Sequence, residues 1–468
     1  MTLGFTSCDS KLDIKPLGMT TLDNVDDLET LLFNLPIVGN DLNMSLLIND
    51  FYYGYADPLP TLLANNYSMD YALITYDESV KRDELVVEDG FYKEMYSKIN
   101  YANILISLMP DATGGTPERK AQLIAEAKIL RAWYHYLLVI KYAKQYDKAT
   151  ASDLGGIAYV DNTNVGEMKQ KLTLAETYEK MLADCSDEVI NDLIQKHVSN
   201  PCRFGADFGN AVRARILLQM KDYENSLIYA KKALAINSRL EDRSGVKDSG
   251  SWTVPYESED NYYLMFANND SNGGGEFWGV TITPDAYACY DPNDFVFKYA
   301  KDSKGLPVWD EPYYEWPAGC KDASLSGVLL NVWGLRSESM IYDAAECYIR
   351  TGNISEGLRQ LDLIRAVRIE NPEKLAEKAS TMTEKEAMKI LQRDKRIEFL
   401  VTFENFADRK RWNSESAYAE DIVRNLNATT NNPNANYGIF TLKPDSPLWV
   451  FPFPSNATQR NPSLTQNY

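Results

Sequence analysis

Apolar residues recur every three or four positions along several stretches of this chain, most clearly over residues 116–143. That spacing places apolar side chains on one face of a helix. Thr116 suits the N-terminal cap of this helix and Pro117 suits its first turn. There are two apolar stripes, and they contain Leu123, Ala127, Leu130, Tyr134, Leu137 and Leu138, and Ile129, Trp133, Tyr136 and Ile140. A helix that is apolar on two sides is packed from both, so we expect it inside a stack of helices.

Two pairs of helices are predicted further along the chain, each joined by a short turn. They are 212–220 with 223–236, and 336–350 with 354–368. The first pair turns at Lys221-Asp222 and carries small alanines at contact positions, a pattern that resembles a tetratricopeptide helix pair. Gly352 suits the left-handed cap between the second two helices. Further helices are expected at 25–35, 92–109, 174–194 and 384–403, the last with a capping box of Thr383 and Glu386.

Two stretches, residues 41–90 and 237–335, lack this helical period and are rich in Gly, Pro, Asn, Asp and aromatic residues, so we interpret them as loops and short strands. Residues 413–447 are interpreted as a polar, Asn-rich loop region. The predicted fold is therefore mainly α, with a tetratricopeptide-like helical-pair scaffold and an irregular lobe. We expect one domain over 9–468, with the scaffold at about 92–236 and 336–412 and the lobe at about 237–335.

Composition and charge disfavour several classes of ligand and of chemistry. The chain has 468 residues and a formal net charge of −19, which disfavours nucleic acid as a partner and, unless a local basic patch exists, other polyanions. Neutral sugars are the weakly favoured ligand on this ground. No apolar run approaches the ~20 residues of a transmembrane helix. The two histidines, His135 in an apolar helix and His197 at a polar helix end, are interpreted as a packing residue and a solvated residue. Common hydrolase chemistry is therefore disfavoured.

Aromatic side chains suggest what the lobe binds. Tyr and Trp present a flat apolar face with one polar atom, which suits the two faces of a sugar ring. The densest stretch is 311–317, where prolines flank the aromatic residues. Each aromatic taken singly is more often a core residue. As a group, the expected glycan contacts are Trp278, Trp309, Tyr313 and Trp316, with Asn65, Asn66, Tyr67 and Asp70 in second rank. We expect no cofactor, because no phosphate-binding loop or paired-cysteine motif occurs, and no metal, because the Asn-Gly turn at 268–273 departs from a calcium loop.

Cys8 follows a short apolar run with small residues and precedes a polar stretch. This order is typical of a bacterial lipoprotein cleavage site, at which the cysteine becomes the lipidated first residue. The stretch before Cys8 is shorter than a full signal peptide and carries no basic residue. The alternative interpretation is an unstructured terminus with one exposed cysteine. We expect residues 1–8 to be a signal remnant that ends at lipidated Cys8.

Several segments in order along the chain resemble the SusD/RagB family. They are the Tyr92–Asn103 and Glu126–Ala132 stretches, Gly155-Gly156-Ile157, Leu363-Ile364-Arg365, Arg396-Ile397-Glu398 with Asp408 and Arg411-Trp412, and the terminal Phe451-Pro452-Phe453-Pro454 with Asn461-Pro462, Leu464 and Gln466-Asn467. There are departures, because Tyr92 stands where the family often has Trp and Asp394-Lys395 replaces its usual Glu-Arg. We expect these departures to alter packing more than function.

The resemblance implies a surface-exposed outer-membrane lipoprotein that is not an enzyme. Such proteins bind oligosaccharides, sometimes peptides, and deliver them to a SusC-like TonB-dependent transporter. Two alternatives remain. One is a glycoside hydrolase on a helical scaffold, for which Glu311 and Glu315 offer a carboxylate pair. The other is a tetratricopeptide-type adaptor that binds protein segments.

Overall fold

The structure is a computed structural model. It describes residues 22–34, 37–39, 41–53, 58–164, 166–197, 200–250, 252, 258–268, 280–300, 331–400, 402–429 and 436–468. None of the helices in these ranges is both long and apolar enough to cross a membrane.

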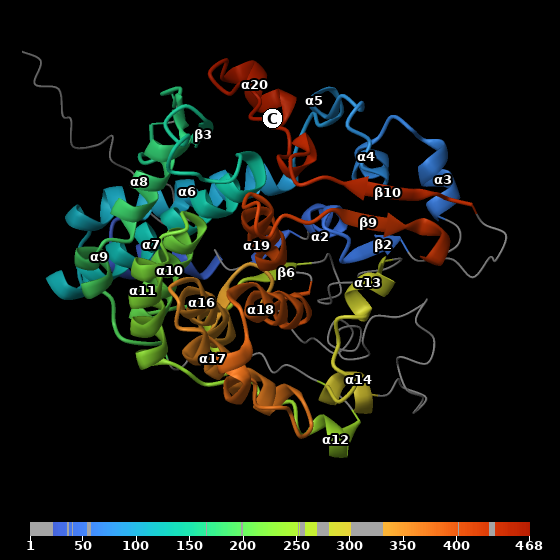
Figure 1. The fold of residues 1–468 in the computed structure, drawn as a ribbon. Helices are drawn as coiled ribbons and strands as arrows, with labels where there is room; N and C mark the ends of the chain where they lie inside the picture. Colours follow the sequence, from blue (N-terminus) through green and yellow to red (C-terminus); the bar gives the residue numbers. More distant parts are fainter. Residues whose placement is uncertain are drawn as a thin grey trace, which may run out of the picture.

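Long helices dominate the described chain (Figure 1). They are α6 (Gly90–Leu108), α7 (Pro117–Tyr142), α8 (Leu174–Asp184), α10 (Ala206–Gln219), α11 (Tyr223–Ile236), α16 (Ser337–Arg350), α17 (Ile354–Arg368), α18 (Glu384–Glu398) and α19 (Phe403–Asn413). The shorter helices are α1 (Val25–Thr30), α2 (Asn43–Leu47), α3 (Pro58–Ala64), α4 (Met69–Thr75), α5 (Arg82–Leu85), α9 (Asp187–Asn191), α12 (Val246–Ser249), α13 (Pro284–Tyr287), α14 (Phe295–Tyr299) and α20 (Ser455–Arg460).

Successive long helices pack as pairs. α6 lies against α7, α10 against α11 and α16 against α17, and the α11–α16 contact joins the last two pairs. Figure 1 shows α7, α10, α11, α16 and α17 side by side, so the predicted mainly α scaffold of paired helices is confirmed. The turns are as expected, since Lys221 and Gly352 both adopt positive φ, 63° and 88°.

The centre of the core is α7, which packs on both sides as its two stripes predicted. Thr116 accepts a hydrogen bond from the Arg119 amide at 3.3 Å and so caps its first turn. Trp133 is fully buried, and its indole nitrogen donates to the Trp333 carbonyl at 2.9 Å. That bond joins the first helical block to the start of the second block, 200 residues later in the chain.

Strands are short and pair in twos. Among the described residues the pairs are β1 (Ile37–Gly39) with β6 (Phe266–Asn268), β2 (Phe51–Tyr53) with β7 (Val280–Ile282), β3 (Gly155–Ala158) with β4 (Lys171–Thr173), β5 (Asn261–Tyr263) with β8 (Leu335–Arg336), and β9 (Ile422–Asn425) with β10 (Ile439–Leu442). Of these five pairs, β1–β6 is parallel and the other four are antiparallel. The β1–β6 and β2–β7 pairs tie the N-terminal region to the irregular lobe.

Several predicted boundaries were wrong. The expected helix 174–194 stops at Cys185, because Ser186 caps a new helix, α9. The expected helix 384–403 divides into α18 and α19, since Thr402 caps α19. Residues 41–90 contain the short helices α2, α3, α4 and α5 as well as a strand, and 413–447 contains the β9–β10 hairpin rather than loop alone.

Candidate functional site

The aromatic residues predicted to bind glycan, Trp278, Trp309, Tyr313 and Trp316, lie outside the described residues, as does Cys8. The described aromatics of the lobe are packing residues. Trp333 is in the main core, and Trp252, Tyr287 and Tyr290 belong to a small cluster around Val296. This agrees with the expectation that a single aromatic residue is more often core than ligand contact.

The second-rank residues lie together at the turn between α3 and α4. Asn65 and Asn66 are exposed, and the Tyr67 side chain is 51% exposed. The Tyr67 hydroxyl donates to Glu84 Oε2 at 2.8 Å, and this carboxylate raises the pKa of Tyr67. Asp70 lies in the first turn of α4 and is half-buried. Three of these residues are therefore open to solvent at one turn.

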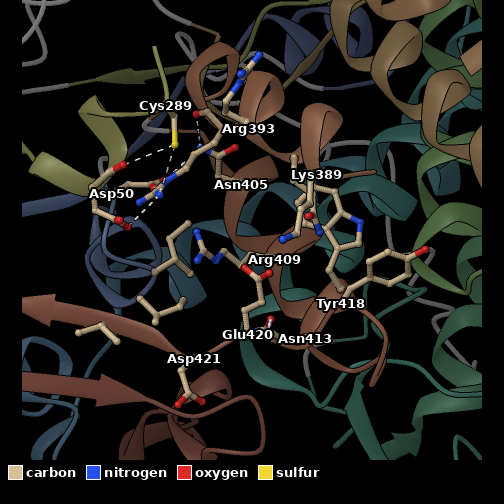
Figure 2. A pocket seen from close by; sticks show the side chains of 17 residues that line it. Asp50, Cys289, Lys389, Arg393, Asn405, Arg409, Asn413, Tyr418, Glu420 and Asp421 are labelled. Carbon is tan, nitrogen blue, oxygen red and sulfur yellow. Dashed lines mark hydrogen bonds and ion pairs between the residues drawn. The ribbon is translucent and has the colours of Figure 1, made fainter. Parts of the chain in front are cut away.

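A pocket of about 490 Å³ opens between α18, α19, β9 and α13 (Figure 2). Its walls come from segments far apart in sequence, which the labels of Figure 2 identify: Asp50, Cys289, Lys389, Arg393, Asn405, Arg409, Asn413, Tyr418, Glu420 and Asp421. Because α13 and Cys289 belong to the irregular lobe, the pocket lies where the scaffold meets that lobe.

Arg396 organises one wall of this pocket. Its Nε donates to Asp50 Oδ1 at 2.8 Å, and its Nη1 donates to Asp285 Oδ2 at 3.1 Å. Asn405 completes the arrangement by donating to the second oxygen of Asp50 at 3.0 Å. Burial opposes the charge of Arg396, but these carboxylates outweigh it and raise the pKa of its guanidinium. The ion pairs hold the lobe helix α13 against α18.

The opposite wall is aromatic. Trp412 and Tyr418 are both largely buried, at 7% and 8% exposure. The Trp412 indole nitrogen donates to Glu346 Oε1 at 2.9 Å, and the Tyr418 hydroxyl donates to Glu384. Because their polar atoms are satisfied by the protein, these side chains offer the pocket mainly apolar surface. The pocket thus combines ring faces with charged groups.

The sequence missed this pocket. In the sequence, Trp412 stands out only through its family motif, and Arg409, one helical turn earlier, does not stand out. The pocket joins Asp50 to Arg396 across 346 residues, which no local pattern indicates. The charge of the segment 389–396 was visible in the sequence, yet helices with many charged residues are usually solvated on one face.

A second, larger groove of about 1010 Å³ runs beside α6. Tyr92, Tyr96, Asn100 and Arg460 are among its lining residues. Tyr92 packs against Tyr142 and Phe453, with ring centroids 5.4 and 6.2 Å apart. Tyr92, at the position where the family often has Trp, therefore places a smaller ring in an aromatic cluster.

The other departure, Asp394-Lys395, also serves packing. Lys395 Nζ lies 2.7 Å from carboxylate oxygens of both Asp343 and Asp408. Those two residues and Glu404 have a spacing that suits a metal ion. Arg215 lies 2.9 Å from Asp343 and 2.7 Å from Asp408, so buried cations already balance this acidic cluster. We therefore interpret the cluster as an internal ion-pair network.

The histidines do not form a catalytic group. His135 is fully buried, its Nδ1 lies 2.8 Å from the Arg131 carbonyl, and its Nε2 accepts the Val160 amide at 3.1 Å. Burial lowers the pKa of His135 to about 3, so the predicted packing role is confirmed. The expectation that His197 is solvated was wrong, because its ring is half-buried and burial lowers its pKa.

The described residues thus show stacked helix pairs, with a pocket where this scaffold meets the described part of the lobe. Two family models match the sequence. One, for starch-binding proteins that associate with the outer membrane, matches residues 48–204, and one for the SusD family matches residues 335–468. The chain belongs to the SusD/RagB family. Glycan-binding proteins of this family are non-catalytic, in agreement with the expectation that the chain is not an enzyme.

Solved structures share the fold along nearly the whole chain. A SusD superfamily protein from Bacteroides thetaiotaomicron superposes with a TM-score of 0.68 at 16% identity, covering 95% of this chain and 100% of the other. A putative sugar binding protein from Bacteroides vulgatus gives 0.66 at 15% identity, covering 96% and 99%. Surface glycan-binding protein A from Bacteroides uniformis gives 0.63 at 14% identity, covering 94% and 99%. No curated protein sequence matches this chain.

Proposed function

We propose that this protein captures oligosaccharides at the outer surface of the outer membrane and delivers them, uncleaved, to a SusC-like TonB-dependent transporter. Membership in the SusD/RagB family is the observation that carries this proposal. Two of the structural neighbours are described as sugar- or glycan-binding, which supports a glycan as the ligand. The pocket where scaffold and lobe meet is consistent with a ligand that contacts both.

The ligand platform that we propose is the aromatic part of the lobe. Trp278, Trp309, Tyr313 and Trp316 stack on sugar rings, while Asn65, Asn66, Tyr67 and Asp70 supply hydrogen bonds from the turn before α4. Exposed amide groups and the largely exposed Tyr67 ring suit that role. Diacylated Cys8 is the proposed anchor.

Titration calorimetry tests the proposal directly. Residues 9–468 are titrated with plant, host and microbial oligosaccharides, and each mixture is then analysed by chromatography for cleavage products. We expect one glycan class to bind and to remain intact. Cleavage of a bound glycan favours the glycoside hydrolase alternative. If no glycan binds but unfolded protein segments do, the tetratricopeptide-type adaptor takes its place.

Simultaneous alanine substitution at Trp309, Tyr313 and Trp316 is predicted to abolish glycan binding. Each stacking contact contributes ~0.5–1.5 kcal/mol beyond the area that it buries, so the loss of three lowers affinity by about ten- to a thousandfold, and the lost apolar contact area adds to this. The control is Tyr101→Ala, which removes a 41%-exposed ring on the scaffold helix α6. Retained affinity in the triple variant, measured by calorimetry, would place the site elsewhere.

A further inference from the structure

Arg409 has no partner among the described residues. It projects from α19 into the middle of the pocket, and neither a hydrogen bond nor an ion pair joins its guanidinium to any residue that the structure describes (Figure 2). A guanidinium carries five N–H donors in a planar fork. In a half-buried position such a group leaves much of its bonding capacity unused, which favours an anionic ligand.

The carboxylates that line the pocket are occupied elsewhere. Asp50 is bound by Arg396 and Asn405, and Asp285 also pairs with Arg396. The same holds for Asp421, which pairs with Lys443. The remaining acidic residue, Glu420, is exposed at the rim and forms no ion pair with Arg409. The protein therefore places several carboxylates around this cation and directs none of them to it.

A second cation of the pocket, Lys389, is also unpaired among the described residues, whereas Arg396 and Arg393 are each paired with carboxylates. Arg396 lies close enough to Arg409 that its charge, after burial, is the main factor lowering the Arg409 pKa. Lys389 lines the pocket from α18, is exposed, and makes no ion pair within the described part of the chain. Arg393, one turn further along α18, pairs with the neighbouring Asp394. Within the described residues, Arg409 and Lys389 are therefore the cations of the pocket that form no ion pair, and Glu420 is the carboxylate there that forms none.

We propose that this pocket binds a carboxylate of an acidic sugar residue, with Arg409 as its two-pronged partner and Lys389 at the rim. The planar fork of arginine matches a carboxylate in two parallel hydrogen bonds. Trp412 and Tyr418 provide apolar surface for the sugar ring on the opposite wall. A volume of about 490 Å³ lies within the range of small-molecule sites. The inference rests on the proposed function and narrows the ligand to carboxylated glycans, such as those with uronic or sialic acids.

The test compares matched glycans on residues 9–468. Galacturonate-, glucuronate- and sialate-containing oligosaccharides are each titrated beside their methyl esters and beside neutral malto-oligosaccharides. We expect an acidic glycan to bind more tightly than any neutral one and to lose about tenfold or more in affinity when its carboxylate is esterified. This comparison uses the unmodified protein, so it does not depend on any variant folding.

Variants then locate the carboxylate. Arg409→Gln is expected to lower the affinity for the acidic glycan about tenfold or more, to the affinity that its methyl ester has for the wild type. The affinity for the ester should not change. Arg409→Lys, which keeps the charge and loses the fork, is expected to fall between. The matched control is Arg460→Gln, which removes the same charge from the exposed wall of the groove beside α6 and should leave affinity unchanged.

The outcomes separate this inference from the proposed function. Binding of neutral glycans alone, or equal binding of acid and ester, overturns the inference while glycan capture stands. Loss of acidic-glycan binding in Arg460→Gln but not in Arg409→Gln also overturns it and moves the carboxylate to the other groove. If neither acidic nor neutral glycans bind, the proposed function itself fails.

Discussion

His135 is buried in the scaffold as a neutral imidazole. Its hydrogen-bond partners come from helix α7, one turn earlier, and from the segment after β3. Its two ring nitrogens meet the Arg131 carbonyl and the Val160 amide, and the Tyr159 ring stacks on it with centroids 3.7 Å apart. Adding a proton would place a second cation beside Arg131, which already pairs with Asp184 at 2.5 Å. The imidazole therefore acts as a hydrogen-bonded spacer between helix α7 and the segment after β3.

This environment has a predicted effect on stability. The pKa of His135 is about 3 in the folded protein, whereas an unperturbed histidine has a pKa of about 6.5, so the unfolded chain takes up this proton first as pH falls. Stability is therefore lost between about pH 6.5 and pH 3, by about 3 kcal/mol at pH 4. Urea unfolding measures the free energy of unfolding at pH 7 and at pH 4. We expect the decrease between these two pH values to be smaller by this amount in His135→Gln than in the wild type.

The comparison variant is His197→Gln, which removes the half-buried histidine. Burial also lowers the pKa of His197, but this burial is only partial. We therefore expect His197→Gln to alter the pH dependence of the free energy of unfolding less than His135→Gln does. An equal pH dependence in the wild type and His135→Gln would contradict the assignment.

Single residues differ in how far the sequence predicts them. The role of His135 follows from its place in an apolar stripe, which local spacing reveals. The role of Arg409 does not, since it depends on Arg396 having taken both Asp50 and Asp285, which lie 346 and 111 residues away from Arg396. Long-range pairing of charges leaves no periodic trace in a sequence.

At the scale of elements, the C-terminal segment closes the first helical block. Gln466 receives the Phe453 amide and donates to the Phe453 carbonyl, at 2.8 and 3.0 Å. Asn467 donates to the carbonyls of Tyr142, the last residue of α7, and Gly156 in β3, at 2.8 and 2.9 Å. These contacts give a physical role to the terminal residues that resemble the family.

Asn467→Ala is therefore predicted to lower the free energy of unfolding by about 1–3 kcal/mol, because two carbonyls lose their donor. Chemical denaturation measures the change. The matched control is Asn456→Ala in α20, whose side chain makes no hydrogen bond to any described residue. Equal stability of Asn467→Ala and the wild type would show that water replaces these bonds without cost.

Elements were predicted well where they are long. α7, α11, α16 and α17 span three or more turns, so the 3.6-residue period had room to appear. The helices α2 to α5 have four to seven residues, too few for a period to be recognised. The break between α18 and α19 escaped detection because apolar spacing continues through it, and only the cap at Thr402 ends the run.

At the scale of the whole molecule, the proposed anchor at Cys8 makes a prediction about location. A chain expressed with a complete bacterial signal segment ahead of Cys8 is expected to incorporate labelled palmitate and to fractionate with membranes. Cys8→Ala should lose both the label and the membrane association, because one apolar terminus without acyl chains binds a bilayer weakly. Cys289→Ala is the control, since this half-buried thiol lies in the pocket wall. Membrane association of Cys8→Ala would point to another anchor.

The whole-molecule charge illustrates the limit of composition. A net charge of −19 favours neutral ligands on average, yet the pocket holds two cations, Arg409 and Lys389, that form no ion pair with any described residue. Average charge governs long-range attraction, whereas a site depends on its own few groups. The sequence therefore predicted the class of fold and of family, while the pocket required the folded arrangement.

A crystal structure of residues 9–468 with the oligosaccharide that binds most tightly would test the account most directly. We predict an intact glycan that lies against the irregular lobe, with its rings on lobe aromatics and one carboxylate on Arg409. A cleaved glycan in the pocket, or an intact one bound only to the outer faces of the helix pairs, would contradict the account.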